Sequence, residues 1–177
     1  IESYDTAVSE KNFNVKKQET DPTACAVFGV FNTHNVFSEQ ERRKLGLRRK
    51  YAALLMDCWS DHLGLPELLE KARAQHAQKW GTPGRRSDIV LIEDRSSGPS
   101  LRQFLHKYDV PVHAYNPGRE SKTTRLHTVS PIVEQGGLFC PESTLPHLKG
   151  QFRDWCLPFI EQLTAYSGPG STEHDDH

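Results

Sequence analysis

The sequence lacks the features that would place the chain in a membrane, in a disulfide scaffold, or on nucleic acid through overall charge. No apolar run approaches the roughly 20 residues of a transmembrane helix, and there is no signal peptide, so we expect a soluble protein. The cysteines have no CxxC spacing, which favours buried, reduced thiols and a cytoplasmic protein. They are Cys25, Cys58, Cys140 and Cys156. Because the formal net charge is −1, any contact with DNA must come from local basic patches or from metal ions.

Two further absences concern the organisation of the chain. The 177 residues contain no internal repeat and no low-complexity tract, so we expect a single domain over residues 1–177. The first residue is Ile1 rather than Met, which suggests a fragment of a longer chain. There is also no GxxxxGK[ST] phosphate loop, so we expect no ATPase motor within this sequence.

The most informative stretch is a short apolar strand that ends in two carboxylates. Residues 89–92 read Ile-Val-Leu-Ile, as expected of a strand covered on both faces in an α/β sheet. Glu93 and Asp94 follow, and they should point to opposite faces because side chains alternate along a strand. Residues 96–99, Ser-Ser-Gly-Pro, supply a turn and a helix N-cap before Leu101. Such a strand carries its last side chains to the carboxyl edge of the sheet, where α/β folds place their ligands.

The rest of the chain predicts a mixed sheet surrounded by helices, that is, an α/β fold. Further strands are predicted at 1–8, 25–31, 51–59, 110–115 and 138–140, and further helices at 66–80, 122–134 and 152–163. Pro111 favours an edge position for its strand, and Pro158 should kink the last helix. The basic segment 37–50 suggests a hairpin or short loop because it contains Gly46.

Acidic residues lie at three separated points that could meet in space. Asp5 is near the end of the first strand, Glu93 ends a central strand, and Asp175 and Asp176 lie near the end of the sequence. Hydrolysis of a phosphodiester with two divalent ions requires such a set, because two hard cations about 4 Å apart need several carboxylate oxygens. From the pattern alone, an acid at a strand end is more often a solvated or turn-capping residue.

Short motifs along the whole chain resemble the C-terminal nuclease domain of phage terminase large subunits. They are Ser-Tyr-Asp-Thr-Ala (3–7), Asp-Pro-Thr-Ala-Cys-Ala-Val-Phe-Gly-Val (21–30), Leu-Ile-Glu-Asp-Arg-Ser-Ser-Gly-Pro-Ser-Leu (91–101), Ser-Lys-Thr-Thr-Arg (121–125), Ser-Pro-Ile-Val-Glu-Gln-Gly (130–136) and His-Asp-Asp (174–176). The resemblance implies an RNase H-like fold in which Asp5, Glu93 and either Asp175 or Asp176 hold two Mg²⁺ or Mn²⁺ ions. The chain departs from the family at Arg95, where relatives often have Lys, and at residues 119–122.

The same resemblance implies a function and partners. We expect a metal-dependent endonuclease that cuts concatemeric viral DNA during genome packaging in the host cytoplasm, with double-stranded DNA as substrate. In a full-length protein, an N-terminal ATPase domain, the portal and the small terminase subunit would be its partners. The alternatives are another RNase H-like nuclease, such as a Holliday-junction resolvase, and a non-cleaving DNA clamp or portal-docking module.

Several other charged side chains are candidate functional residues, and each also has a simpler structural interpretation. Lys122 and Arg125 share a helix face and are candidates for a phosphate contact, or they form a solvated face. The basic cluster is either a grip on duplex DNA or an exposed surface, and its candidate DNA-binding residues are Arg42, Arg43, Arg48 and Arg49. For Asp94 the parity favours a structural partner such as Arg95 or a loop amide.

Two further groups have simple expected roles. His174 and His177 flank the last acids and make a zinc site conceivable, although oxygen ligands suit magnesium and manganese better. Phe152, Trp155 and Phe159 are predicted to be core residues.

Overall fold

The structure is a computed structural model that describes residues 1–7 and 21–165. Its contacts divide the chain into two compact units. Unit 1 consists of Ile1–Val27 and Trp59–Pro117, and unit 2 consists of Phe28–Cys58 and Gly118–His177. The expected single domain stays a prediction.

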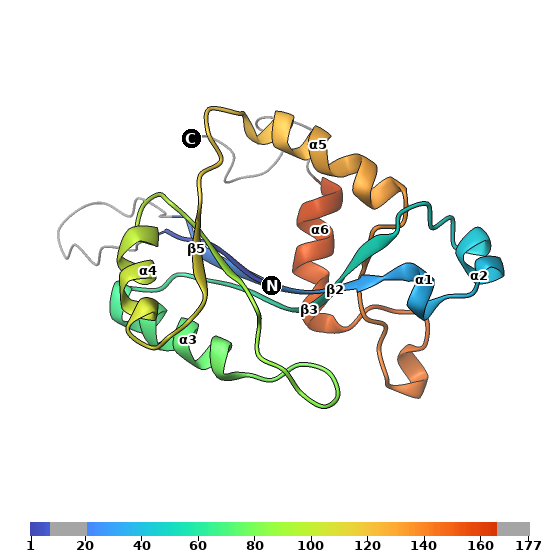
Figure 1. The fold of residues 1–177 in the computed structure, drawn as a ribbon, viewed down its shortest axis with the longest axis horizontal. Coiled ribbons are helices and arrows are strands. Elements are labelled where there is room, and N and C mark those ends of the chain that lie inside the picture. Colours follow the sequence, from blue (N-terminus) through green and yellow to red (C-terminus); the bar gives the residue numbers. More distant parts are fainter. Residues whose placement is uncertain (8–20, 166–177) are drawn as a thin grey trace. The chain divides into compact units, whose positions relative to one another are not determined.

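A six-stranded mixed sheet forms the framework, in the order β5-β4-β1-β2-β3-β6. Figure 1 labels three of its strands, β2, β3 and β5. The strands are β1 (Glu2–Asp5), β2 (Thr23–Asn32), β3 (Tyr51–Asp61), β4 (Val90–Glu93), β5 (Val112–Tyr115) and β6 (Leu138–Phe139). Strand β1 is antiparallel to β2 and parallel to β4, while β4 is parallel to β5 and β3 is parallel to β6. The α/β prediction is therefore confirmed, and the mixed sheet with flanking helices is consistent with an RNase H-like layout. Strand β5 lies at a sheet edge, as Pro111 predicted.

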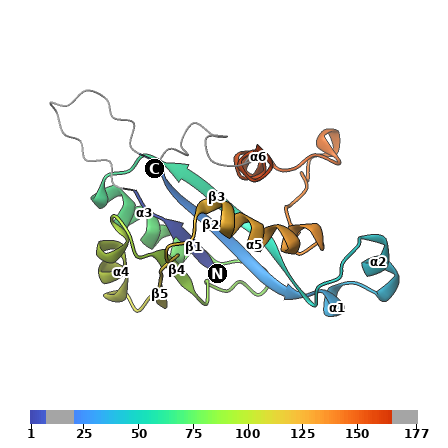
Figure 2. The same ribbon diagram turned by 90° about the horizontal axis from the view of Figure 1, so that it is seen from above.

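In unit 1 the sheet buries one face against two helices, α3 (Leu65–Ala77) and α4 (Gly98–His106). Tyr4 and Ile92 point into this core, and Leu68, Leu101 and Leu105 meet them from the helices, all five almost completely buried. Helix α3 begins with a proline in its first turn, where a missing N–H costs little. It ends at Ala77, earlier than the predicted boundary near residue 80. Figure 2 shows both helices beside β1, β4 and β5.

The same buried face of unit 1 contains a carboxylate. Glu2 is fully buried, and it accepts a hydrogen bond from the Tyr4 hydroxyl at 3.3 Å. Its other oxygen lies 3.3 Å from Nδ1 of His76 on α3. Burial, followed by the nearby Cys25 and Glu2, raises the pKa of Tyr4, so this hydroxyl remains a proton donor. Hydrogen bonds therefore satisfy the buried acid.

In unit 2, aromatic side chains hold β2 and β6 to the segment that follows β2. Phe31 packs on Phe139 with ring centroids 5.4 Å apart, and Phe37 stacks on Phe139 at 5.7 Å. Phe28 meets Phe159 edge to face at 6.1 Å, which fixes helix α6 (Leu157–Ala165) against β2. Helix α5 (Lys122–Glu134) forms where predicted, with Ser121 as its N-cap.

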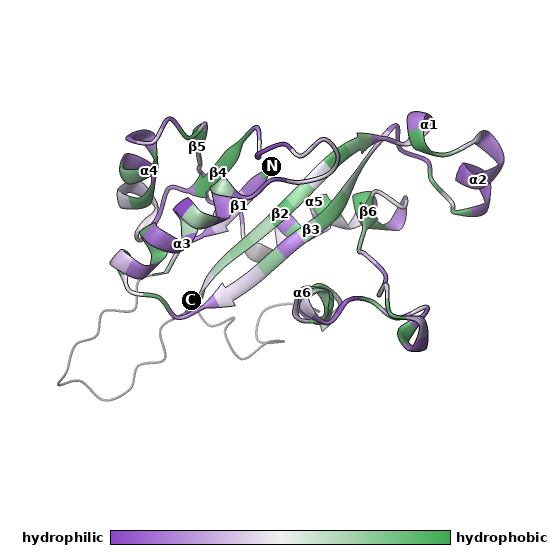
Figure 3. Ribbon diagram, turned by 90° about the horizontal axis from the view of Figure 1, so that it is seen from below, coloured by the Kyte–Doolittle hydropathy of each residue, from purple (hydrophilic) through white to green (hydrophobic). Residues whose placement is uncertain are grey.

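The segment between β2 and β3 is helical, so the predicted hairpin or short loop is wrong. It contains α1 (Thr33–Val36) and α2 (Glu39–Lys44). The reason is a capping box, in which Ser38 and Glu41 each accept a hydrogen bond from the other's backbone N–H. The Ser38 hydroxyl also donates to Glu41 Oε2 at 2.7 Å, and this bond, followed by the one from the Ser38 N–H, lowers the pKa of Glu41 because both favour its ionised form. Figure 3 shows α2 as strongly hydrophilic, in agreement with its exposed position.

The predicted kink at Pro158 is also wrong. A short 3₁₀ turn, Asp154–Cys156, precedes α6, which begins at Leu157, so Pro158 occupies the first turn, where proline is tolerated. Phe152 lies before these helices and is 45% exposed, which corrects its predicted core position.

All four cysteines are free thiols, as predicted, but their burial differs. Cys25 and Cys156 are buried, whereas Cys58 and Cys140 are only partly buried. Burial, followed by the nearby Cys140 and Cys58, raises the pKa of Cys156 to about 11.

Candidate metal centre and basic surface

Asp5 and Glu93 end two neighbouring parallel strands of unit 1. Tyr4 pairs with Ile92, so Asp5 and Glu93 are one residue further along their strands on the opposite side from this buried pair. The two carboxylates therefore lie on the same face of the sheet, at the edge formed by the carboxyl ends of its parallel strands. Glu93 is partly buried and Asp5 is exposed, so the pair remains accessible to solvent.

The turn after Glu93 brings α4 against the end of β4. Gly98 begins α4, and a Cβ at this position would overlap the backbone oxygen of Glu93. Ser96 adopts a left-handed conformation with φ of 50°, which is uncommon for a residue with a side chain. Ser97 is the N-cap, as expected, but its side chain makes no capping hydrogen bond. The backbone of the turn between Glu93 and Gly98 therefore has little freedom to move.

The side chains that follow Glu93 divide between the two faces. Arg95 Nε lies 3.6 Å from Glu93 Oε1, on the side of the candidate site. Asp94 instead pairs with Arg102 of α4 at 3.3 Å, which corrects the expectation that Arg95 is its partner. Asp94 thus lies on the side of helix α4 and Glu93 on the opposite face, as the alternation of side chains along a strand predicts. The Thr6 hydroxyl donates to the backbone oxygen of Arg95 at 3.3 Å, which connects the ends of β1 and β4.

Two residues on β5 share the face of the acids and were not among the predicted site residues. Tyr115 pairs with Glu93, and His113 pairs with Leu91, in parallel register. Tyr115 is 47% exposed, and its backbone oxygen accepts from the Asp94 N–H at 2.8 Å. The alternation in Val-His-Ala-Tyr was the available signal, since it places His113 and Tyr115 on one side of the strand.

Asp5 and Glu93 supply part of the ligand set that a hard divalent cation needs. Carboxylate oxygens are the preferred ligands of Mg²⁺ and Mn²⁺, and Asp5 and Glu93 present them from a buried framework. Within residues 1–7 and 21–165, no group of three or more His, Cys, Asp or Glu side chains is placed to hold a metal ion. The remaining candidate ligands lie outside the described residues, as do the histidines beside them: Asp175, Asp176, His174 and His177.

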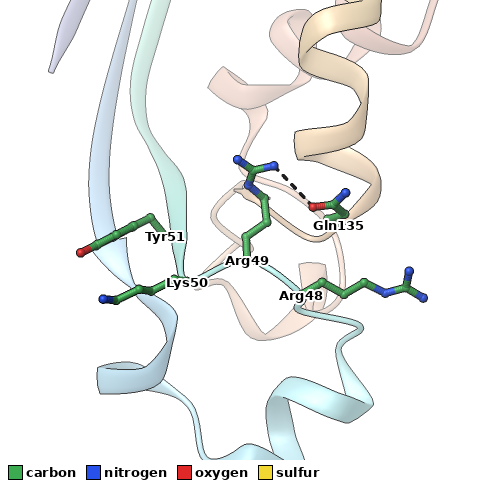
Figure 4. A pocket seen from close by; sticks show the side chains of 5 residues that line it. All are labelled: Arg48, Arg49, Lys50, Tyr51 and Gln135. Carbon is green, nitrogen blue, oxygen red and sulfur yellow. Dashed lines mark hydrogen bonds between the residues drawn. The ribbon is translucent and has the colours of Figure 1, made fainter.

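The predicted DNA-binding arginines of unit 2 differ in what they contact. Arg43 forms an ion pair with Glu39 on α2, and Arg42 Nη1 lies 2.7 Å from Nε2 of His34. Arg48 and Arg49 line a surface hollow of about 360 Å³ (Figure 4). The predicted group thus separates into two arginines with side-chain partners on α1 and α2 and two that line the hollow.

The other predicted DNA contacts lie on α5 in unit 2. Lys122 is the first residue of this helix, and Arg125 is one turn further along and partly buried. The Nε atom of Arg125 is buried and has no hydrogen-bond partner among the residues that the structure describes. A phosphate contact by these two residues stays a prediction.

Comparisons with known proteins add no identification. No family model, no curated protein and no solved structure matches the chain. None of the helices in the described ranges is both long and apolar enough to cross a membrane.

Proposed function

We propose that this chain is a metal-dependent DNA endonuclease of the type found in terminase large subunits. The observation that carries the proposal is the pairing of β1 with β4, which puts Asp5 and Glu93 on one face at one sheet edge. The sequence resemblance named the same two residues, and the register of the strands is independent of that resemblance. We include in the proposal a third acidic ligand, Asp175 or Asp176.

The residues at the ends of β1 and β4 have different roles in the proposed reaction. Asp5 and Glu93 would hold divalent cations, Thr6 connects the ends of β1 and β4, and Gly98 allows α4 to begin close against the end of β4. When bound, two such ions lower the pKa of a water nucleophile and stabilise the leaving oxygen. Arg95 lies beside Glu93, where its charge can balance the carboxylate before an ion binds.

The biological setting belongs to the same proposal. The substrate is concatemeric viral DNA, cut during packaging in the host cytoplasm. The portal and the small terminase subunit are the proposed partners of a longer protein that also contains the ATPase domain.

Substitution of the two acids tests the proposal. In Mn²⁺, plasmid cleavage by D5N and E93Q should fall by at least about 100-fold, since even residues that only orient metal ligands contribute about 10–100-fold. Mn²⁺ should also raise the melting temperature of the wild type and not of these variants, because binding to the folded state stabilises it. D94N is the matched control, since this carboxylate is adjacent to Glu93 but pairs with Arg102. Cleavage by D5N and E93Q at the wild-type rate would refute the ligand assignment.

The basic hollow of unit 2 favours one alternative, a DNA clamp that does not cleave. It predicts that DNA binding is unaffected by EDTA and that no nicking occurs in Mg²⁺ or Mn²⁺. Nicking by the wild type that disappears in D5N and E93Q would exclude this alternative.

A further inference from the structure

The hollow of unit 2 is lined by three consecutive cations and contains no carboxylate among its five lining residues. These are Arg48, Arg49, Lys50, Tyr51 and Gln135. The three cations and Tyr51 are exposed. Arg49 Nη1 lies 3.4 Å from Oε1 of Gln135, which also lines the hollow. Three cations close together repel one another, so this surface favours an anionic ligand.

The backbone beneath these cations is fixed from the inside. Thr33 is almost completely buried, and its hydroxyl donates to the carbonyl of Arg49 at 2.8 Å and to that of Lys50 at 3.2 Å. The Thr33 N–H also donates to the Lys50 carbonyl at 2.8 Å, and the Arg48 N–H donates to the Gln135 carbonyl at 3.3 Å. The peptide groups thus face the protein interior, which leaves the basic side chains available to a ligand.

The directions of the side chains indicate an extended ligand rather than a single small anion. Figure 4 shows Arg48 and Lys50 pointing to opposite sides of the segment, with Arg49 directed toward Gln135. Three cations that diverge cannot converge on one phosphate, but they can contact successive phosphates of a strand. The volume of the hollow, about 360 Å³, is near the lower end of the roughly 300–1,000 Å³ of small-molecule sites.

Tyr51 adds an aromatic ring to the same hollow. Its side chain is 56% exposed, although Lys50 Nζ lies 5.4 Å from the ring centroid. A cationic groove with an exposed ring is typical of sites for single strands, because unpaired bases offer a face for stacking. In a duplex the base faces are already stacked on one another, so such a ring would gain little.

We propose that the surface formed by Arg48, Arg49, Lys50 and Tyr51 binds a single-stranded stretch of DNA. The cations contact its phosphates and Tyr51 stacks on a base. The proposal rests on the proposed function only for the choice of DNA as the polymer. Its ligand is separate from the ions at Asp5 and Glu93, so binding should not require a metal.

Binding measured in EDTA tests the surface without cleavage. The probes are a fluorescent dT oligonucleotide and a blunt duplex of mixed sequence, each titrated with the complete chain at several NaCl concentrations. The R48Q/R49Q/K50Q variant should bind the single strand roughly 10–100-fold more weakly at about 0.1 M NaCl. The slope of log K against log[NaCl] should also be shallower by about two for this variant, because each lost contact with a single-strand phosphate removes about 0.7.

Two further variants separate this surface from a general charge effect. K79Q/R85Q/R86Q removes three exposed cations from unit 1 and should leave single-strand affinity within about twofold of the wild type. Y51L should weaken single-strand binding by roughly fivefold or more, which is the lower end of a stacking contribution, and change duplex binding by less than about twofold. Circular dichroism of each variant establishes that it is folded.

The outcomes distinguish this proposal from the proposed function. Unchanged single-strand affinity in the folded triple variant would overturn it, and so would an equal loss in both triple variants. An equal effect of Y51L on single strands and duplex, or tighter binding of duplex than of single strands, would also overturn it. A wild type that binds the strand in EDTA but never nicks plasmid would instead refute the nuclease and leave the surface in place.

Discussion

The edge of unit 1 and the hollow of unit 2 present opposite charges on backbones that are fixed in different ways. Asp5 and Glu93 take their positions from parallel strands whose alternate residues are buried. Arg48 and Arg49 lie outside any strand, and hydrogen bonds from Thr33 and to Gln135 fix their backbone. The first arrangement defines where single oxygen atoms lie, which metal ligation needs. The second fixes only the base of long side chains, which suits a flexible polyanion.

The largest effect should come from adding a methyl group at Gly98, next to the backbone of Glu93. In G98A the new Cβ would overlap the backbone oxygen of Glu93, which cannot move without shifting β4. We expect a loss of more than about 3 kcal/mol in the free energy of unfolding, at the upper end of the cost of overpacking. Urea denaturation measures it, and any folded G98A should also show no stabilisation by Mn²⁺. A loss below about 1 kcal/mol, the lower end of that cost, with normal Mn²⁺ binding would mean that the turn is more compliant than described.

The equivalent change in unit 2 should cost less. Gly136 has φ of 69°, and a Cβ there would lie 2.6 Å from Cδ2 of Leu47, a flexible side chain. The left-handed conformation alone costs an alanine about 1–2 kcal/mol, so G136A should lose about 1–3 kcal/mol in the same denaturation experiment. Cleavage by the folded fraction should remain, because no candidate ligand lies on this segment. If G136A lost more stability than G98A, unit 2 would be the more rigid part.

The smallest effect should come from the support of the basic segment. T33V keeps the shape of a buried side chain but removes the hydroxyl that donates to Arg49 and Lys50. We expect a loss of about 1–2 kcal/mol in unfolding free energy, because the Arg49 carbonyl loses its hydroxyl donor while the Lys50 carbonyl keeps the Thr33 N–H, and a weakening of single-strand binding by a few fold. T128V is the control, because this exposed hydroxyl donates to the Thr124 carbonyl within its own helix. Equal behaviour of the two variants would show that Thr33 does not position the segment.

Much of the acidic edge could be predicted from the sequence because strands follow simple rules. The apolar run at 89–92 identified a central strand, and the alternation of side chains alone assigned Glu93 and Asp94 to opposite faces. The pairing of β1 with β4 was beyond those rules, since strand order depends on contacts far apart in sequence. Tyr115 was missed for that reason, because its place beside Glu93 follows from the register of β5.

The basic region was harder to predict, for two different reasons. Its helix α2 was foreseeable, since Ser38 and Glu41 stand at the spacing of a capping box, but Gly46 suggested a turn. The separation of Arg43, paired with Glu39, from Arg48 in the hollow depends on tertiary structure. Pro158 shows a related limit, because a proline starts or breaks a helix according to where that helix begins.

The pairing of β1 with β4 limits which sequence changes these two strands can accept during evolution. Deleting or inserting one residue within Glu2–Asp5 would turn the terminal aspartate toward α3 and α4, and would bring Tyr4 out to solvent. If the proposed function is right, length changes inside these short strands should therefore abolish metal-dependent cleavage even where every acid is retained. Lineages of this protein should vary by substitution within β1 and β4, and by insertion only in the connections outside them.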